Sequence, residues 1–208
     1  MSDRAAIFFD RDGTLNEEVG YAGSLDRFHI YPFAAEAVRR VNQAGLLAIL
    51  ITNQAGVARG YFPESAVHDL YASLQQHLAG HGAFLDAMYY CPHHPEAGVG
   101  AYLQRCDCRK PRPGLLQQAA RDFHLDLAAC ALVSDRYTDI GMAHSVGMRA
   151  ALVLTGYGQR DREQQQAAGD RSPEIVAADA LEAVEQILRH RLVTTRGETS
   201  VTEAGPRS

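Results

Sequence analysis

The chain has 208 residues, 46% of them hydrophobic, which is enough to bury one sizeable core, so we expect a single domain. No segment is apolar for long enough to cross a membrane, and the polar start Met1-Ser2-Asp3-Arg4 is unlike a signal peptide, so we expect a cytoplasmic protein without a membrane partner. The formal net charge of −5 and the absence of a Lys/Arg run argue against nucleic acid as a partner.

Apolar runs alternate with segments of helical periodicity, which predicts an α/β fold with a mainly parallel sheet covered on both faces. The predicted strands are residues 5–10, 46–52, 88–91, 130–134, 150–154 and 175–177. The predicted helices are residues 33–44, 63–79, 113–123, 139–146 and 180–191. Residues 156–172 are polar and predict a connector or a surface helix. We expect one domain over 1–192 and a disordered tail over 193–208.

The pentad Asp10-Arg11-Asp12-Gly13-Thr14 directly follows the first apolar run. Two carboxylates at positions i and i+2 of an extended chain point to the same side of a sheet. Like charges so close are unfavourable unless a cation lies between them, and Mg²⁺ takes such oxygen ligands together with substrate phosphate. The alternative is a strand followed by an acidic turn, because Asp-Gly pairs are common in turns. The pentad alone leaves both interpretations open.

Three further polar signals follow along the chain. They are Thr52-Asn53-Gln54 after the apolar run 46–51, Arg109-Lys110-Pro111 at the start of a helical stretch, and Ser134-Asp135-Arg136-Tyr137-Thr138-Asp139 after the run 131–133. Ligands of parallel sheets bind beyond the carboxyl ends of the strands, so we expect Asp10, Thr52 and Asp135 to lie together.

The cysteines indicate a second metal site. Cys91-x-His93, twelve intervening residues and Cys106-x-Cys108 are typical of a closed, structural zinc site with three thiolates and one imidazole. The alternatives are two disulfides, which fit a cytosolic chain poorly, or cysteines that simply pack, which leaves their tight pairing unexplained. His94 competes with His93 as the fourth ligand. Cys130 lies in a strand-like run and is expected to be an inert core residue.

The four polar signals have the order of the four motifs of the haloacid-dehalogenase-like (HAD-like) phosphatases, which the chain resembles over about residues 5–155. Within that superfamily three segments resemble the heptose-bisphosphate phosphatases, namely Asn53-Gln54-Ala55-Gly56-Val57-Ala58-Arg59-Gly60, Cys91-Pro92-His93-His94-Pro95 and Cys106-Asp107-Cys108-Arg109-Lys110-Pro111. The related histidinol-phosphate phosphatases tend to have a shorter loop between the cysteine pairs. The resemblance implies a Rossmann-like three-layer α/β/α fold and favours His93 as the zinc ligand.

The resemblance also implies roles for the motif residues. Asp10 would form an aspartyl phosphate, and Asp12 would act as general acid and then as general base. Mg²⁺ would be held by Asp10, Asp135 and the backbone carbonyl of Asp12, with Asp139 in support. The implied substrate-binding residues are Glu18, Val19, Gly20, Tyr21, Thr52, Asn53, Gln54, Ala55, Arg59, Arg109, Lys110 and Arg136.

Within that set, three residues would contact the phosphoryl oxygens. Thr52 offers a hydroxyl, Asn53 an amide, and Lys110 a fixed cation, so Thr52 and Lys110 are counted as catalytic. Arg109 adjoins the zinc ligand Cys108, so the zinc site would aim Arg109 and Lys110 at the substrate.

The chain departs from the common motif sequences at three positions. Relatives commonly have Gly-Asp-Lys where this chain has Ser134-Asp135-Arg136, and Ser where it has Ala55. Because Lys and Arg differ in reach and geometry at a phosphate, these changes bear on substrate preference. The loops after Asp12 and Thr52 are too short for a full cap domain, so residues 16–24, 53–62 and 91–108 would close the site.

The resemblance therefore implies a monomeric, Mg²⁺-dependent and zinc-containing phosphatase acting on a small phosphorylated sugar. The expected reaction removes the 7-phosphate of a heptose 1,7-bisphosphate during synthesis of nucleotide-activated heptose for lipopolysaccharide. Histidinol phosphate is the alternative substrate. A zinc-stabilised binding protein without turnover is the alternative of another class, against which the presence of both Asp10 and Asp12 argues.

Overall fold

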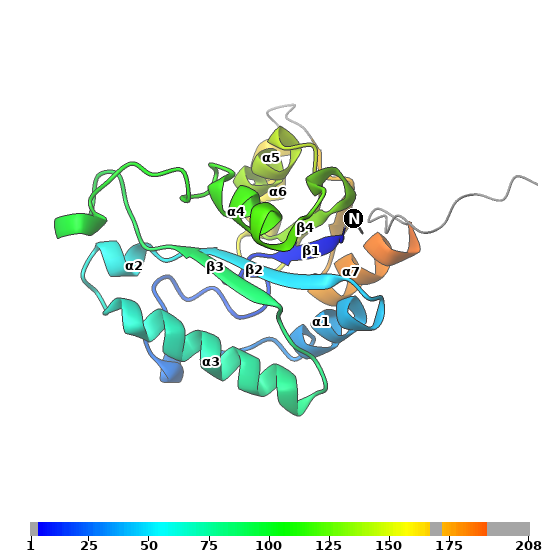
Figure 1. The fold of residues 1–208 in the computed structure, drawn as a ribbon, viewed down its shortest axis with the longest axis horizontal. Helices are drawn as coiled ribbons and strands as arrows, with labels where there is room; N and C mark the ends of the chain where they lie inside the picture. The colour runs from blue at the N-terminus through cyan, green and yellow to red at the C-terminus, as the bar shows by residue number, and fades with distance from the viewer. Residues whose placement is uncertain (1–3, 167–171, 191–208) are drawn as a thin grey trace, which may run out of the picture.

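The structure, a computed structural model, describes residues 4–166 and 172–190. In these residues six parallel strands form one sheet in the order β3-β2-β1-β4-β5-β6 (Figure 1). Their bounds are β1 Ala6–Phe9, β2 Leu47–Asn53, β3 Ala87–Cys91, β4 Ala131–Ser134, β5 Arg149–Val153 and β6 Ile175–Ala177. The strand order reverses between β1 and β4, where ligands of such sheets bind.

Helices cover both faces of the sheet (Figure 1). One face carries α1 Ala34–Gln43, α3 Glu64–Gly80 and α7 Ala180–Arg189, and the other carries α4 Gly114–Phe123, α5 Tyr137–Ser145 and α6 Gly158–Gln166. The short helix α2 Ala55–Ala58 follows β2, and the 3₁₀ turns are Leu25–Arg27, Gly100–Tyr102 and Leu127–Ala129. The described chain therefore has the predicted three-layer α/β/α architecture.

Strand β1 shows why the sheet is the centre of the core. Ile7 and Phe9 face the core under α1, α3 and α7, whereas Ala6 and Phe8 face the core under α4 and α5. All four side chains are fully buried, so the strand is apolar on both faces, as parallel strands between two helical layers are. Burying one large apolar side chain in this way stabilises the fold by about 1.5–3 kcal/mol.

The predicted strands and helices all occur, and the ends that the structure describes differ from the predicted ends by at most two residues. The helix α2 was not predicted. In the segment 156–172 the surface-helix alternative is correct, because α6 occupies Gly158–Gln166, whereas 167–171 lie outside the described residues. The predicted tail 193–208 also lies outside them.

The described residues contain no cap domain. Between β1 and α1 the only helix is the 3₁₀ turn Leu25–Arg27, and between β2 and α3 the only helix is α2. No described helix combines the length and apolar character that crossing a membrane requires.

Candidate active site

A pocket of about 500 Å³ opens at the carboxyl ends of β1, β2 and β4, where the strand order reverses. Its lining is Asp10, Asp12, Glu18, Gly20, Tyr21, Thr52, Asn53, Gln54, Ala55, Arg109, Lys110, Pro111, Asp135, Arg136, Thr138, Asp139 and Tyr157. The structure thus brings together most of the predicted site residues. Val19 and Arg59 are predicted site residues that do not line it.

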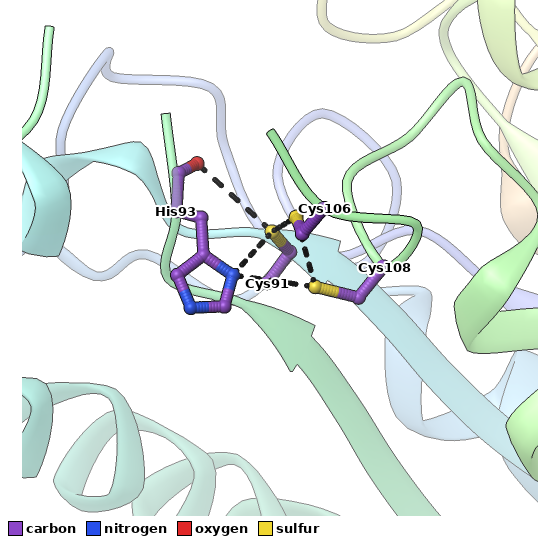
Figure 2. A group of neighbouring side chains, drawn as sticks. All are labelled: Cys91, His93, Cys106 and Cys108. Carbon is purple, nitrogen blue, oxygen red and sulfur yellow. Dashed lines mark hydrogen bonds between the residues drawn. The ribbon is translucent and has the colours of Figure 1, made fainter. Parts of the chain in front are cut away.

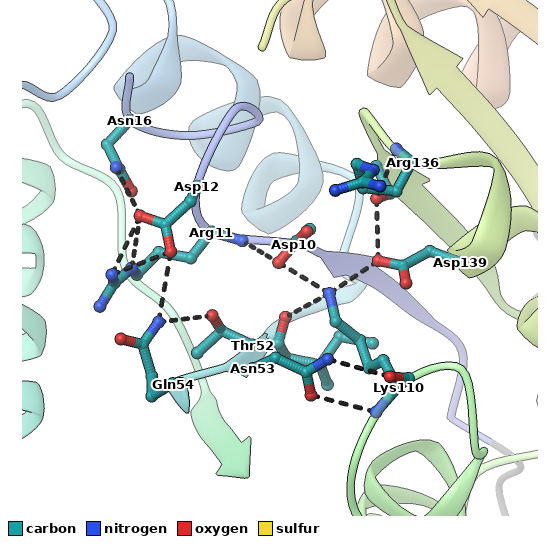
Figure 3. A network of polar contacts seen from close by, with 12 residues as sticks. Asp10, Arg11, Asp12, Asn16, Thr52, Asn53, Gln54, Lys110, Arg136 and Asp139 are labelled. Carbon is teal, nitrogen blue, oxygen red and sulfur yellow. Dashed lines mark hydrogen bonds and ion pairs between the residues drawn. The ribbon is translucent and has the colours of Figure 1, made fainter. Parts of the chain in front are cut away.

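Lys110 lies at the centre of the polar network, buried and between two carboxylates (Figure 3). Its Nζ is 2.8 Å from Asp10 Oδ1 and 2.6 Å from Asp139 Oδ2. Burial disfavours the ammonium ion, but the charges of Asp10 and Asp139 outweigh it and raise the pKa of Lys110. Lys110 is therefore a fixed cation beside Asp10.

Asn53 holds the backbone of Lys110 from the end of β2. Asn53 Nδ2 donates to the Lys110 carbonyl and Lys110 N donates to Asn53 Oδ1, both at 3.0 Å (Figure 3). This reciprocal pair joins the end of β2 to the segment that carries Lys110. The side chain of Asn53 thus orients the lysine, a contact that the sequence did not indicate.

Asp12 is held by donors from three residues (Figure 3). Arg11 donates to it from Nε at 3.1 Å and from Nη2 at 2.9 Å, Asn16 Nδ2 donates at 2.9 Å, and Gln54 Nε2 donates at 3.2 Å. Gln54 Nε2 also donates to Thr52 Oγ1 at 2.8 Å. These contacts fix the Asp12 carboxylate at the pocket, and the sequence had not indicated that Arg11 and Asn16 bind it.

Asp135 is a buried carboxylate that lines the same pocket as Asp10. Its Oδ2 accepts from Tyr157 N at 2.8 Å, whereas its buried Oδ1 has no hydrogen-bond partner among the described residues. Burial, followed by the charge of Asp10, raises the pKa of Asp135 to about 8. Burial likewise raises the pKa of Asp10 to about 6, although Lys110 opposes the shift. Two crowded carboxylates with an unpartnered oxygen fit a hard cation such as Mg²⁺.

Two of the predicted closing loops contribute directly to the pocket wall. Glu18, Gly20 and Tyr21 come from residues 16–24, and Gln54 and Ala55 come from residues 53–62. The loops also contact each other, because the guanidinium carbon of Arg59 lies 5.7 Å from the ring centroid of Tyr21. Val19 lines a neighbouring pocket instead, and its carbonyl accepts from Arg27 at 2.7 Å.

The predicted zinc ligands converge in space (Figure 2). Cys91 Sγ is 3.5 Å from Cys106 Sγ, Cys108 Sγ is 3.4 Å from His93 Nδ1, and all four ligand atoms lie within 4.8 Å of one another. Tetrahedral zinc with bonds of about 2.0–2.3 Å separates its ligand atoms by about 3.5–3.8 Å. The cluster therefore has the dimensions and the donor types to hold zinc.

The structure also bears on two of the alternatives for these residues, the disulfides and His94. The cysteines form no disulfide in the described structure, so the disulfide interpretation is wrong. His94 lies outside the cluster, and its Nδ1 accepts from Glu96 N at 3.1 Å and Ala97 N at 2.9 Å. Cys130 is a buried core residue, as predicted.

Arg109 connects the zinc-binding cluster to the pocket. It follows Cys108, its Nη1 donates to the carbonyl of His93 at 3.1 Å, and it lines the pocket next to Lys110. A metal that fixes His93 would therefore also fix this contact of Arg109.

A family model described as HAD-hydrolase-like matches residues 107–183. The D-glycero-D-manno-heptose-1,7-bisphosphate 7-phosphatase of Thermosynechococcus vestitus is 44% identical over 191 residues, which cover 90% of this chain and 97% of that protein. This chain belongs to the HAD-like phosphatases. The D-glycero-beta-D-manno-heptose-1,7-bisphosphate 7-phosphatase of Escherichia coli K12 is 41% identical over 153 residues, which cover 73% of this chain and 80% of that enzyme.

A solved structure of another HAD-like phosphatase has a similar fold. The D,D-heptose 1,7-bisphosphate phosphatase from B. bronchiseptica, complexed with magnesium and phosphate, matches with a TM-score of 0.79 and 32% identity. The match covers 90% of this chain and 99% of that chain. The HAD-like fold is therefore shared over nearly the whole length of both chains.

In this HAD-like phosphatase Ser134 and Arg136 replace the Gly and Lys that relatives commonly have, and both residues form specific contacts in the structure. Ser134 Oγ donates to Asp139 Oδ2 at 2.9 Å and accepts from Arg136 N at 3.2 Å. Arg136 Nε donates to Asp161 Oδ2 at 3.0 Å, and its guanidinium carbon lies 4.8 Å from the ring centroid of Tyr157. Sequence reasoning missed Tyr157 and Asp161, because the polar segment that contains them had no motif.

Proposed function

We propose that this HAD-like phosphatase uses Mg²⁺ to hydrolyse the 7-phosphate of D-glycero-D-manno-heptose 1,7-bisphosphate through an aspartyl phosphate on Asp10. The observation that carries the proposal is the meeting of Asp10, Lys110 and Asp135 in one pocket at the switch point of the sheet. The names of the relatives support the substrate. The reaction would supply a heptose 1-phosphate for activation by a nucleotide.

Asp10 is the proposed nucleophile. Lys110 Nζ and Arg11 N both contact its Oδ1, at 2.8 Å and 2.7 Å, so we assign the attack on phosphorus to Oδ2. The new bond joins Asp10 Oδ2 to phosphorus while the bond from phosphorus to the sugar oxygen breaks. Lys110 holds the carboxylate in place and offers its positive charge beside the phosphoryl group.

Asp12 is the proposed general acid and base. It would protonate the leaving sugar oxygen, and it would then accept a proton from the water that attacks the aspartyl phosphate and releases inorganic phosphate. Its contacts with Arg11, Asn16 and Gln54 support this role, because they hold the carboxylate at the pocket in one orientation. Such positioned proton transfer contributes about 10²–10⁴-fold to rates.

The proposed Mg²⁺ ligands are Asp10, Asp135 and the backbone carbonyl of Asp12. When bound, the ion would neutralise the approach of a carboxylate to a phosphate dianion. Asp139 pairs with Lys110 and Ser134, which supports a positioning role for it rather than metal binding. The proposed zinc ligands are Cys91, His93, Cys106 and Cys108, whose zinc would have a structural role.

The remaining pocket residues would bind the sugar and its second phosphate. Arg109 and Arg136 line the pocket and can bind the phosphate that is not cleaved. Glu18 has carboxylate oxygens that suit sugar hydroxyls, and burial, followed by the charge of Asp12, raises its pKa. Arg59 contacts the ring of Tyr21, so we assign it to holding that loop.

A phosphate-release assay tests the proposal. Purified protein is given heptose 1,7-bisphosphate, histidinol phosphate and unrelated sugar phosphates, each with Mg²⁺ or with EDTA. We expect Mg²⁺-dependent release with the highest kcat/KM for the heptose bisphosphate. A higher kcat/KM for histidinol phosphate would favour the alternative substrate, and no release from any compound would favour a binding protein. The cytoplasmic location and the monomeric state stay predictions.

A further inference from the structure

Helix α6 places a buried carboxylate, that of Asp161, beside the pocket. The proposed mechanism does not use this carboxylate. The side chain of Asp161 is only 10% exposed. Its Oδ2 accepts from Arg136 Nε at 3.0 Å and from the backbone N–H of Tyr137 at 3.2 Å. Asp161 therefore connects α6 both to a pocket arginine and to the first residue of α5.

Arg136 is held on two sides by residues of this segment. Its Nε edge faces Asp161, and one face of its guanidinium lies over the ring of Tyr157. The two Nη groups are the remaining donors, and Arg136 lines the pocket. A lysine has neither an Nε donor nor a planar face, so it could not be held in this way.

The start of α6 is itself fixed against the sheet. A Cβ atom on Gly158 would overlap the carbonyl of Val153 at the end of β5, so the two backbones are in close contact. Tyr157 N donates to Asp135 Oδ2 at 2.8 Å, and Asp161 N donates to the carbonyl of Tyr157 at 2.8 Å. Asp161 thus cannot shift without moving a segment that contacts Asp135.

We propose that Asp161 is a positioning residue for Arg136 and thereby sets the preference of the enzyme for substrates with a second anionic group. The inference rests on the proposed function, because Arg136 acts on the phosphate that is not cleaved. Asp161 touches no substrate. It holds Arg136 so that the two Nη donors meet that phosphate as a pair.

Asp161 affects kcat/KM in two ways, through its negative charge and through the position it gives Arg136. Losing the charge raises kcat/KM and losing the position lowers it, and the two effects can be measured separately. Removing its negative charge favours every anionic substrate, whether the substrate carries one phosphate or two. Releasing Arg136 weakens only substrates with a second phosphate. Both substrates have the same cleaved phosphate, so the charge of Asp161 affects them alike. The ratio of kcat/KM for heptose 1,7-bisphosphate to kcat/KM for heptose 7-phosphate therefore reports the position of Arg136.

The test compares Asp161→Asn with Glu163→Gln. Both variants remove one negative charge from α6, but Glu163 is exposed and pairs with Gln159 on its own helix. We expect the kcat/KM ratio to fall by about 10- to 100-fold in Asp161→Asn, the scale of one lost charge-assisted hydrogen bond. In Glu163→Gln we expect the ratio to stay at the wild-type value.

A double-mutant cycle with Arg136→Lys shows whether Asp161 acts through the arginine. Arg136→Lys alone should lower the ratio similarly, and adding Asp161→Asn should lower it no further. Arg136→Lys leaves the bond between Asp161 and Tyr137 N available, so an unchanged ratio in this variant would overturn the inference even if Asp161→Asn folds poorly. An unchanged ratio in Asp161→Asn, or additive effects in the double variant, would overturn the inference. A wild-type enzyme that fails on both heptose phosphates but cleaves p-nitrophenyl phosphate would contradict the proposed substrate instead.

Discussion

Gly13→Ala should disable the enzyme by moving Asp135. Gly13 has φ +78°, and a Cβ there would lie 2.6 Å from Asp135 Cγ and closer still to Oδ2. Ordinary contact begins at 3.4 Å, so Asp135 Cγ must retreat by about 0.8 Å, the difference of the two distances, and Oδ2 must retreat further. Retreat is hindered, because Gly156 packs against the same carboxylate and Tyr157 N is bonded to Oδ2. A displacement of about 1 Å at a catalytic group can lower rates about 10²-fold.

Gly45→Ala is the matched control for this substitution. Gly45 has φ +71°, and no described atom beyond its own residue and its two chain neighbours lies within 4 Å of the position of its Cβ. Both variants should therefore lose about 1–2 kcal/mol of stability from a left-handed alanine. Only Gly13→Ala should also lose about 10²-fold in kcat/KM and require more Mg²⁺ for half-maximal rate.

The assay measures phosphate release across a Mg²⁺ titration, together with the Tm of each variant. A Gly13→Ala enzyme whose kcat/KM and Mg²⁺ requirement match those of Gly45→Ala would refute the reasoning. Such a result would mean that Asp135 has room to move, or that its position does not matter to the reaction.

Three further substitutions test the proposed roles. Asp10→Asn should abolish phosphate release while keeping the wild-type Tm, because an amide is a poor nucleophile; substantial residual turnover would exclude Asp10 as nucleophile. Asp12→Asn should lower kcat by about 10²–10⁴-fold for sugar phosphates and by less for aryl phosphates, whereas equal losses would indicate another role for Asp12. Cys108→Ser should remove the zinc measured by elemental analysis and raise KM more than it lowers kcat, because Arg109 loses its orientation; normal zinc content with unchanged KM would contradict this.

The sheet and most of the pocket could be predicted because of how parallel sheets are built. A strand buried on both faces, such as β1, is a continuous apolar run, and the polar residue that follows it must lie at the carboxyl edge. Asp10, Thr52 and Asp135 each follow such a run, and they share one pocket. The convergence of Cys91, His93, Cys106 and Cys108 could be predicted equally well, because two close cysteine pairs at the ends of one loop are typical of a zinc site.

The contacts of α6 could not be predicted, because they depend on three-dimensional pairing and not on periodicity. The helix has a polar composition without an apolar face, so the sequence does not show which side of it meets the protein. Asp161 is nevertheless buried, and its partner Arg136 lies twenty-five residues away in the sequence. Asn53 illustrates the same limit, because its partner Lys110 lies 57 residues away in the sequence. An amide after a strand suits a phosphate, but the structure bonds both of its ends to Lys110.

The charges of the pocket explain why an acidic chain can act on an anionic substrate only with a divalent cation. The lining contains five carboxylates, those of Asp10, Asp12, Glu18, Asp135 and Asp139, against three cations, those of Arg109, Lys110 and Arg136. Two of the cations are already paired, Lys110 with Asp10 and Asp139, and Arg136 with Asp161. Counting Asp161 and also Arg11, which pairs with Asp12, gives six carboxylates against four cations, so a formal charge of −2 faces a phosphate dianion. One bound Mg²⁺ cancels that charge, so the ion serves the affinity for phosphate as well as the attack by Asp10.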